Sequence, residues 1–177
     1  MRKTFVPALL LLGAAATAGA AELRVEMNAV DARGVGAPLG QVTIAEKDAG
    51  VSFIPELKGL PPGPHGFHVH EFANCGAKAK DGMVSAAEMA GGHWDPDKHQ
   101  RHGGPDGRGH RGDLPPLVVS PDGHARTAVD VKGVKLSALK GKSLVIHAGG
   151  DNHSDQPKPN GGGGERIACG VIQAGVR

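Results

Sequence analysis

Strong net charge is missing from this sequence. Its 20 lysines and arginines nearly balance its 18 aspartates and glutamates, and the formal charge of +2 falls to zero without the two cationic residues at positions 2 and 3. Nucleic-acid-binding domains usually carry a clustered basic surface. The balance therefore argues against a nucleic-acid partner, and any attraction of a charged ligand must come from local placement of charge.

Long hydrophobic runs are also missing, with one short exception at the amino terminus. Residues 5–16 are apolar, follow a cationic start and precede Ala-Gly-Ala at residues 18–20. This run is too short to cross a bilayer as a helix and has the pattern of a secretory signal peptide. No second apolar run follows, which argues against the alternative of a membrane anchor. We expect a signal peptide over residues 1–20, cleavage near Ala20–Ala21, and one periplasmic or secreted domain over residues 21–177, free of the membrane in its mature form.

Cysteine is scarce, since Cys75 and Cys169 are the only two in the chain. A signal peptide would deliver them to an oxidising compartment, where paired cysteines are the rule. We therefore predict a disulfide between them rather than two free buried thiols. In the chain-entropy model, a bridge that closes so long a loop contributes about 4–5 kcal/mol to stability.

Helical periodicity is absent from every window of ten or more residues after the amino-terminal run, and only residues 85–89 suggest a helical turn. Short stretches with strand-like alternation or apolar character recur instead, separated by turn residues such as Pro121-Asp122-Gly123, which predicts a hairpin. Many short strands favour an antiparallel sandwich or barrel. The predicted strands are residues 23–28, 41–46, 51–57, 65–72, 117–120, 125–131, 143–147 and 167–172.

Two long segments interrupt this rhythm of strands. Residues 75–113 and 149–165 are polar and rich in glycine, and the first of them holds four of the ten histidines. Loops of this length inside a compact domain are usually functional or disordered. The histidines are therefore the main guide to function.

His68 and His70 lie two residues apart on a predicted strand, so their imidazoles point to the same face while Phe67 and Val69 face the core. Two side-by-side imidazoles on rigid backbone form half of a metal site, although this pattern alone is weak evidence. His147 lies at the end of another predicted strand and would be an exposed histidine if it stood alone.

The polar loop adds three further histidines and an aspartate: His93, His102, His110 and Asp113. Three imidazole nitrogens and one carboxylate oxygen match a tetrahedral zinc site. The loop has almost nothing apolar to fold on, and a bound metal would give it order, because binding free energy becomes folding free energy. The alternative is a solvated histidine-rich loop.

Five segments of the sequence resemble the copper/zinc superoxide dismutases, in the order that this family shows. They are HGFHVHE at 65–71, GGHWDP at 91–96, GDLP at 112–115, IHAGGDN at 146–152 and GGGGERIACG at 161–170. GDLP, GGDNHSD and GGGG are similar to the bacterial periplasmic branch, and the resemblance extends over residues 23–172. It implies an all-β fold, an eight-stranded antiparallel Greek-key β-barrel or sandwich of immunoglobulin-like architecture with two long functional loops.

The resemblance also implies a ligand set for one catalytic copper ion and one structural zinc ion per subunit. His93 would be deprotonated and would bridge the two metals. Imidazole suits copper in both oxidation states, and a zinc ion with four protein ligands is closed to substrate. The implied copper ligands are His68, His70, His93 and His147, and the implied zinc ligands are His93, His102, His110 and Asp113.

Two more residues acquire roles from the resemblance. Asp151 matches an aspartate that links a copper histidine to a zinc histidine and fixes their orientation. Arg166 matches an arginine beside the copper, where a guanidinium would attract an anion and donate hydrogen bonds to it. Spacing alone would leave Arg166 as an ordinary surface residue.

The implied activity is the disproportionation of superoxide to oxygen and hydrogen peroxide by cycling of copper between Cu(II) and Cu(I). A secreted copper carrier on the same fold is the alternative, but it would need neither Arg166 nor a full zinc set. A zinc hydrolase would require an open zinc position. The sequence leaves a homodimer and a monomer both open. It also leaves open whether Lys78 and Lys80 attract substrate and what His99 does.

Overall fold

The computed structural model describes residues 21–80, 82–105 and 108–173. The predicted signal peptide, residues 1–20, lies outside these residues. In the part that is described, no helix is long and apolar enough to cross a membrane.

Strands dominate the described chain, as the sequence predicts. The only α-helix among the described residues is the four-residue α1, Leu136–Leu139, and two 3₁₀ helices cover Glu88–Ala90 and Asn160–Gly162. The strands are β1 Glu22–Asp31, β2 Gly34–Lys47, β3 Gly50–Lys58, β4 Gly63–His65, β5 Phe67–His70, β6 Lys78–Lys80, β7 Met83–Ser85, β8 Leu117–Val119, β9 His124–Ala125, β10 Val129–Lys132, β11 Lys142–His147 and β12 Arg166–Ile172.

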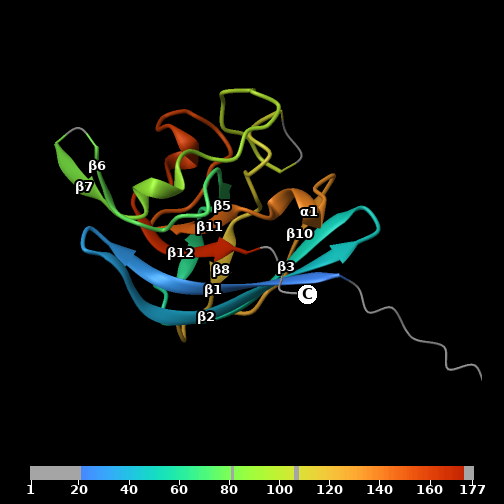
Figure 1. Cartoon of the computed structure of the whole chain (residues 1–177), viewed down its shortest axis with the longest axis horizontal. Helices are drawn as coiled ribbons and strands as arrows, with labels where there is room; N and C mark the ends of the chain where they lie inside the picture. Colours follow the sequence, from blue (N-terminus) through green and yellow to red (C-terminus); the bar gives the residue numbers. More distant parts are fainter. Residues whose placement is uncertain (1–20, 81, 106–107, 174–177) are drawn as a thin grey trace, which may run out of the picture.

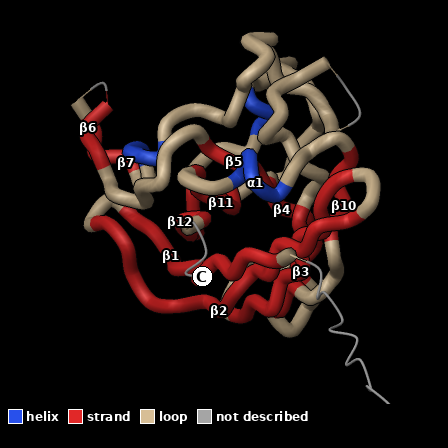
Figure 2. The backbone as a smooth tube through the Cα atoms, turned by 45° about the vertical axis from the view of Figure 1, so that its right-hand side comes forward, coloured by secondary structure: helices blue, strands red, loops and turns tan. Residues whose placement is uncertain are grey.

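Eight strands form one antiparallel sheet in the order β10-β3-β2-β1-β12-β11-β5, with β9 also paired to β3. The chain passes from β3 to β5 and from β10 to β11 by crossing between opposite ends of this order, as a Greek key requires. Figures 1 and 2 show the sheet curled around the interior. The expected all-β Greek-key architecture is confirmed.

Buried and exposed side chains alternate along the strands, and the buried ones form the core. In β1, the side chains of Leu23, Val25 and Met27 are buried, whereas those between them are exposed. Phe53 of β3 and Phe67 of β5 meet edge to face, with their ring centroids 5.8 Å apart. Each fully buried side chain of this size stabilises the fold by about 1.5–3 kcal/mol.

The strand predicted over residues 65–72 is wrong as a single element, because it breaks at Gly66. The N–H of Gly66 donates to Gly149 O at 2.8 Å and its carbonyl accepts from the His147 N–H at 2.8 Å. β4 on one side of the break pairs with β8, and β5 on the other pairs with β11. Gly66 is thus the point where the chain passes between two sheets.

The predicted hairpin around Pro121-Asp122-Gly123 is also wrong in part. A turn is present, since Gly123 has φ +78° and its N–H donates to Ser120 O at 2.9 Å. The flanking strands β8 and β9, however, pair with β4 and β3 rather than with each other. The strand predicted over residues 125–131 is divided between β9 and β10.

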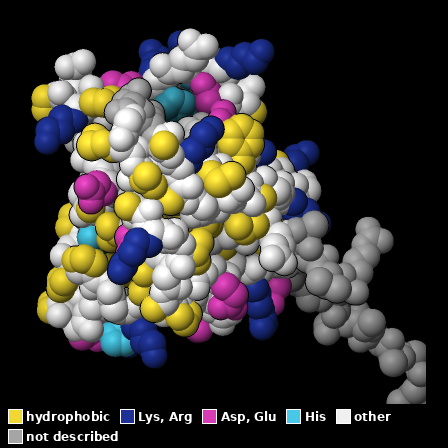
Figure 3. Space-filling model, turned by 60° about the vertical axis from the view of Figure 1, so that its left-hand side comes forward, with side chains coloured by type: hydrophobic (Ala, Val, Ile, Leu, Met, Phe, Trp, Pro, Cys, Tyr) yellow, Lys and Arg dark blue, Asp and Glu magenta, His cyan; other side chains and the backbone are white. Residues whose placement is uncertain are grey.

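The first long loop contains structure that the sequence analysis did not predict. The β6–β7 hairpin lies within it, and the helical turn expected at residues 85–89 is present as the 3₁₀ helix Glu88–Ala90. Exposed hydrophobic side chains gather in this region, on the side that comes forward in Figure 3. They are Phe72, Met83, Val84 and Met89.

The predicted disulfide between Cys75 and Cys169 is confirmed, with a Cα–Cα distance of 5.7 Å. It lies in a second, smaller hydrophobic cluster that also contains Ala87, Ala90 and Val145. This cluster attaches the first long loop to β11 and β12. Figure 1 shows that both long loops lie on one side of the molecule, at the top of the view.

Candidate metal centre

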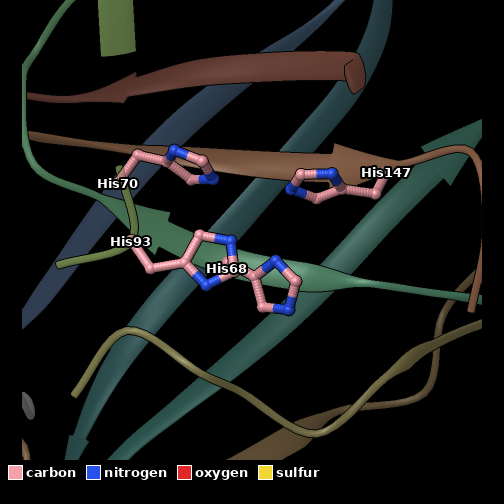
Figure 4. A group of neighbouring side chains, drawn as sticks. All are labelled: His68, His70, His93 and His147. Atoms are coloured by element: carbon pink, nitrogen blue, oxygen red, sulfur yellow. The ribbon is translucent and has the colours of Figure 1, made fainter. Parts of the chain in front are cut away.

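Four histidines, which we call the first group, converge where β5 meets β11 (Figure 4). His68 of β5 pairs with Val145 of β11, so His147, two residues further on, lies on the same face as His68. The ladder between β11 and β12 shifts register at His147, and such irregularities redirect side chains beside functional sites. The group consists of His68, His70, His93 and His147, each offering a nitrogen within 4.8 Å of the others.

Three of these imidazoles are held by a hydrogen bond to one ring nitrogen while the other is left without a partner. The unpaired buried atoms are His68 Nδ1, His70 Nε2 and His147 Nε2. An unsatisfied buried polar atom costs free energy unless a ligand satisfies it, so three of them aimed into one space fit a metal ion. The holding contacts are His68 Nε2 to Asp151 Oδ2 at 2.8 Å, His70 Nδ1 to Gly91 O at 3.0 Å and His147 Nδ1 to Gly164 O at 3.1 Å.

Burial keeps this first group neutral. Desolvation is the main cause that lowers the pKa of His93 to about 4 and of His147 to about 3. The pKa values of His68 and His70 are lowered for the same reason. Neutral imidazole is the form that binds a metal. Each imidazole can therefore offer one nitrogen to a metal at neutral pH without losing a proton, and only a histidine that binds two metals would have to give one up.

A second group, formed by His68, His93, His102 and Asp113, lies directly beside the first. Asp113 Oδ1 is 2.8 Å from His93 Nδ1 and 3.1 Å from His102 Nδ1. His110 Nδ1 lies 3.3 Å from the same oxygen. Three imidazole nitrogens thus converge on one carboxylate oxygen, which is the donor set of a tetrahedral zinc site.

His110 is the one predicted zinc ligand that the tighter grouping omits, since His68 takes its place there. Its side chain is nevertheless only 13% exposed and directed at Asp113. His99, by contrast, points away, with its Nδ1 2.8 Å from Gly109 O, and it belongs to neither group. His102 rather than His99 is the histidine that meets Asp113.

The two zinc-side histidines outside the first group, His102 and His110, hold protons more tightly than an ordinary imidazole does. Burial opposes charge on His102, but its contacts with Asp113 and Asp151 raise its pKa to about 9. The hydrogen bond to Asp113 likewise raises the pKa of His110. Although burial opposes it, contact with these histidines holds the pKa of Asp113 well below its usual range. A divalent cation here would displace protons from the imidazoles.

Asp151 links the two groups. Its Oδ2 lies 2.8 Å from His68 Nε2, and its Oδ1 lies 2.8 Å from His102 Nε2. The carboxylate is buried, and despite that burial its hydrogen bonds to both histidines keep its pKa well below the usual range. One side chain therefore orients an imidazole in each group.

A closed set of backbone hydrogen bonds, which the sequence analysis did not predict, joins three of the segments that carry the site residues. The Val69 N–H donates to Gly112 O at 2.9 Å, the Gly112 N–H to Trp94 O at 2.8 Å, and the Trp94 N–H to Val69 O at 2.8 Å. We call this set the backbone triangle. Each corner adjoins a histidine or aspartate of the site, so the triangle fixes their separation.

Arg166 lies opposite His147 in the ladder between β11 and β12. Its Nη1 donates to Ala87 O at 2.6 Å and its Nη2 to Gly91 O at 2.7 Å, so the first long loop holds the guanidinium in place. Gly91 O also accepts from His70 Nδ1. Burial lowers the pKa of Arg166, but a guanidinium still keeps its charge. A fixed cation thus lies beside the first group.

We expect the metal-free chain to lose stability as the pH falls from about 6.5 to about 4. The lowered pKa values of the first group mean that the unfolded chain takes up protons in this range that the folded chain does not, at about 1.4 kcal/mol per group and pH unit. His102 and His110, with raised pKa values, are protonated in both states there. Urea unfolding at pH 6 and pH 5 measures the effect. Equal midpoints would contradict a neutral first group.

Comparison with known proteins identifies the family. The profile described as Copper/zinc superoxide dismutase (SODC) matches residues 39–172. Superoxide dismutase [Cu-Zn] from Escherichia coli (strain K12) is 56% identical over 172 residues, covering 97% of this chain and 99% of the relative. That of Photobacterium leiognathi is 45% identical, with coverage of 97% and 98%.

Solved structures agree with the sequence relatives. The Cu/Zn superoxide dismutase from Brucella abortus superimposes with a TM-score of 0.83 at 45% identity, covering 86% of this chain and all of that one. The monomeric copper, zinc superoxide dismutase from Salmonella enterica gives 0.77 at 54% identity, with the same coverage. The chain therefore belongs to the copper/zinc superoxide dismutase family.

Proposed function

We propose that the chain disproportionates superoxide to oxygen and hydrogen peroxide at a copper ion held by the first group, beside a zinc ion. The observation that carries this assignment is the set of three buried, unpaired imidazole nitrogens that face one another. The copper would be held by His68, His70, His93 and His147, and the zinc by His93, His102, His110 and Asp113. Copper would supply the redox chemistry, accepting an electron from one superoxide and giving it to the next, while zinc would be structural.

His68 and His93 both belong to the two groups, but Nε2 of His68 is taken by Asp151, whereas Nδ1 of His93 faces Asp113. His93 is therefore the residue assigned to both metals. Its Nδ1 contacts Asp113, which leaves Nε2 for the copper side. Peroxide formation needs two protons for each pair of superoxide ions. Nε2 of His93, which can hold a proton when it has no metal, is the chain's own candidate for delivering one of them.

Arg166 is assigned to substrate attraction. Its Nη1 donates to Ala87 O and lies 3.7 Å from Glu88 Oε2, and its Nη2 donates to Gly91 O. The remaining N–H groups are left for an anion beside His70 and His147. Its charge lowers the pKa values of both histidines, although burial contributes more. Focused positive charge at a cleft raises the association rate of anions by about 10–10³-fold.

Replacing Arg166 with alanine should keep both metals and slow superoxide turnover by about 10-fold or more, with a weaker dependence on ionic strength. Superoxide decay at low and high salt, together with metal content, measures this. Arg126→Ala is the matched control, because that arginine is exposed and pairs only loosely with Asp122. A rate and salt dependence equal to those of the parent chain would remove Arg166 from the mechanism.

A copper carrier on the same fold is not supported as the function. The matching profile and the curated relatives are dismutases. The chain also has the arginine and the zinc-side residues that a carrier would not need.

We further propose that residues 1–20 are a cleaved signal peptide, that residues 21–177 form the mature domain, and that this domain acts in the periplasm. One chain supplies every residue of both groups, and the Salmonella enterica relative is described as monomeric. A monomer is therefore the simpler functional unit than the homodimer, and sedimentation equilibrium distinguishes the two.

A further inference from the structure

The segment around His102 is held from outside its own loop. Its imidazole Nε2 contacts Asp151, and its backbone N–H donates to Asp155 Oδ2 at 2.8 Å. Both aspartates belong to the second long loop, residues 149–165. The next N–H, that of Gly103, donates to Asp113 Oδ2 at 2.9 Å. Consecutive peptide groups at His102 are thus each fixed by a carboxylate.

Asp155 has a second contact that connects His102 to the rest of its own loop. Its Oδ1 accepts from the Asn160 N–H at 3.0 Å. Asn160 precedes Gly161, where φ is +70° and an added Cβ would overlap Asp151 Oδ1 and lie 2.7 Å from His102 Nε2. The backbone at Gly161 is therefore packed directly against the contact between Asp151 and His102.

We propose that Asp155 is a positioning residue for the zinc side of the centre, acting through the backbone of His102. The proposal rests on the proposed function, because it takes His102 as a zinc ligand. Asp151 constrains the ring of His102 and Asp155 constrains its main chain. With both contacts in place, Nδ1 lies 3.1 Å from Asp113 Oδ1 and is buried without a hydrogen-bond partner, so it stays available to a metal.

The chemistry of a carboxylate explains why this position is an aspartate. The two oxygens accept one N–H each, from His102 and from Asn160, and the same hydrogen bonds lower the pKa of Asp155. An asparagine has a single carbonyl oxygen and would present an NH₂ group to one of these donors. An alanine would accept from neither. Asp155→Asn should therefore lower the zinc affinity less than Asp155→Ala does.

The experiment uses the full mature chain with Asp155→Asn, Asp155→Ala and the control Glu26→Gln. Glu26 is exposed on β1 and belongs to neither group. Zinc affinity is measured by chelator competition, and cobalt(II) absorption reports the geometry of the zinc-side ligands. Copper affinity is measured in parallel.

We expect zinc affinity to fall by about 10-fold for asparagine and up to about 100-fold for alanine, the range for residues that support metal ligands. The cobalt spectrum should change, and copper affinity should stay within about 3-fold. Equal zinc affinity in all chains would overturn the role of Asp155. Equal loss of both metals would also overturn it, since that indicates a general structural effect. If the parent chain itself bound no zinc tightly, the proposed function would fail first, and this proposal with it.

Discussion

Replacing His93 with alanine should remove zinc and weaken copper binding in one step, and it should abolish dismutation. His93 belongs to both groups, with its Nδ1 2.8 Å from Asp113 Oδ1 and its ring 4.1 Å from that of His68, centroid to centroid. No other residue joins the two metals directly by this assignment. The loss of zinc affinity should exceed the roughly 10–100-fold that outer-shell substitutions cost.

Metal content after extensive dialysis, measured for zinc and copper separately, checks this expectation. His124→Ala is the control, because His124 begins β9, belongs to neither group and has a side chain that is 32% exposed. If the His93→Ala chain kept both metals at full occupancy, the assignment of a shared ligand would be wrong. Loss of copper alone would place His93 in the first group only.

Replacing Gly112 with alanine should destabilise the whole centre without removing any ligand. An added Cβ would overlap the carbonyl oxygen of Val69 and lie 2.9 Å from Trp94 N. Both neighbours are backbone atoms of the backbone triangle, so neither can rotate away. Overpacking costs about 1–3 kcal/mol, and each hydrogen bond lost from the triangle costs about 1 kcal/mol more. We expect a total loss of about 3 kcal/mol or more in the free energy of unfolding.

Gly92→Ala provides the matched control for this substitution. Gly92 lies beside His93, but an added Cβ there would meet only Glu71 Oε2, at 4.0 Å. Denaturant unfolding of the metal-free chains compares the two variants. The Gly112→Ala chain should unfold at a markedly lower denaturant concentration than the parent and should bind both metals weakly. The Gly92→Ala chain should match the parent in both measurements. Similar unfolding of the two variants would show that the triangle does not hold the centre together.

The parts of the centre on rigid strands were predictable from local pattern. His68 and His70 face one way because strand side chains alternate, and the structure places both in the first group. The loop histidines could be grouped by composition, but composition does not separate His102 from His99. Their difference depends on which of them Asp113, Asp151 and Asp155 reach, and that depends on contacts between distant segments.

The failures of prediction also have a common physical cause. Gly66 breaks the expected long strand because its peptide groups bond to Gly149 and His147, far along the chain. The residues near Gly66 in the sequence do not predict those hydrogen-bond partners. The same holds for the backbone triangle, whose three members lie in separate segments. The periodicity of apolar residues indicates which face of a single strand or helix is buried. The break at Gly66 and the backbone triangle depend instead on contacts between several elements.

By the proposed function, this chain uses a copper ion in the first group to disproportionate superoxide. The most direct test is the rate of superoxide decay with the mature chain loaded with copper and zinc, compared with the same chain loaded with zinc alone. We expect fast, cyanide-sensitive decay that requires copper. Tight copper binding with a decay rate no higher than that of the zinc-only chain would contradict it.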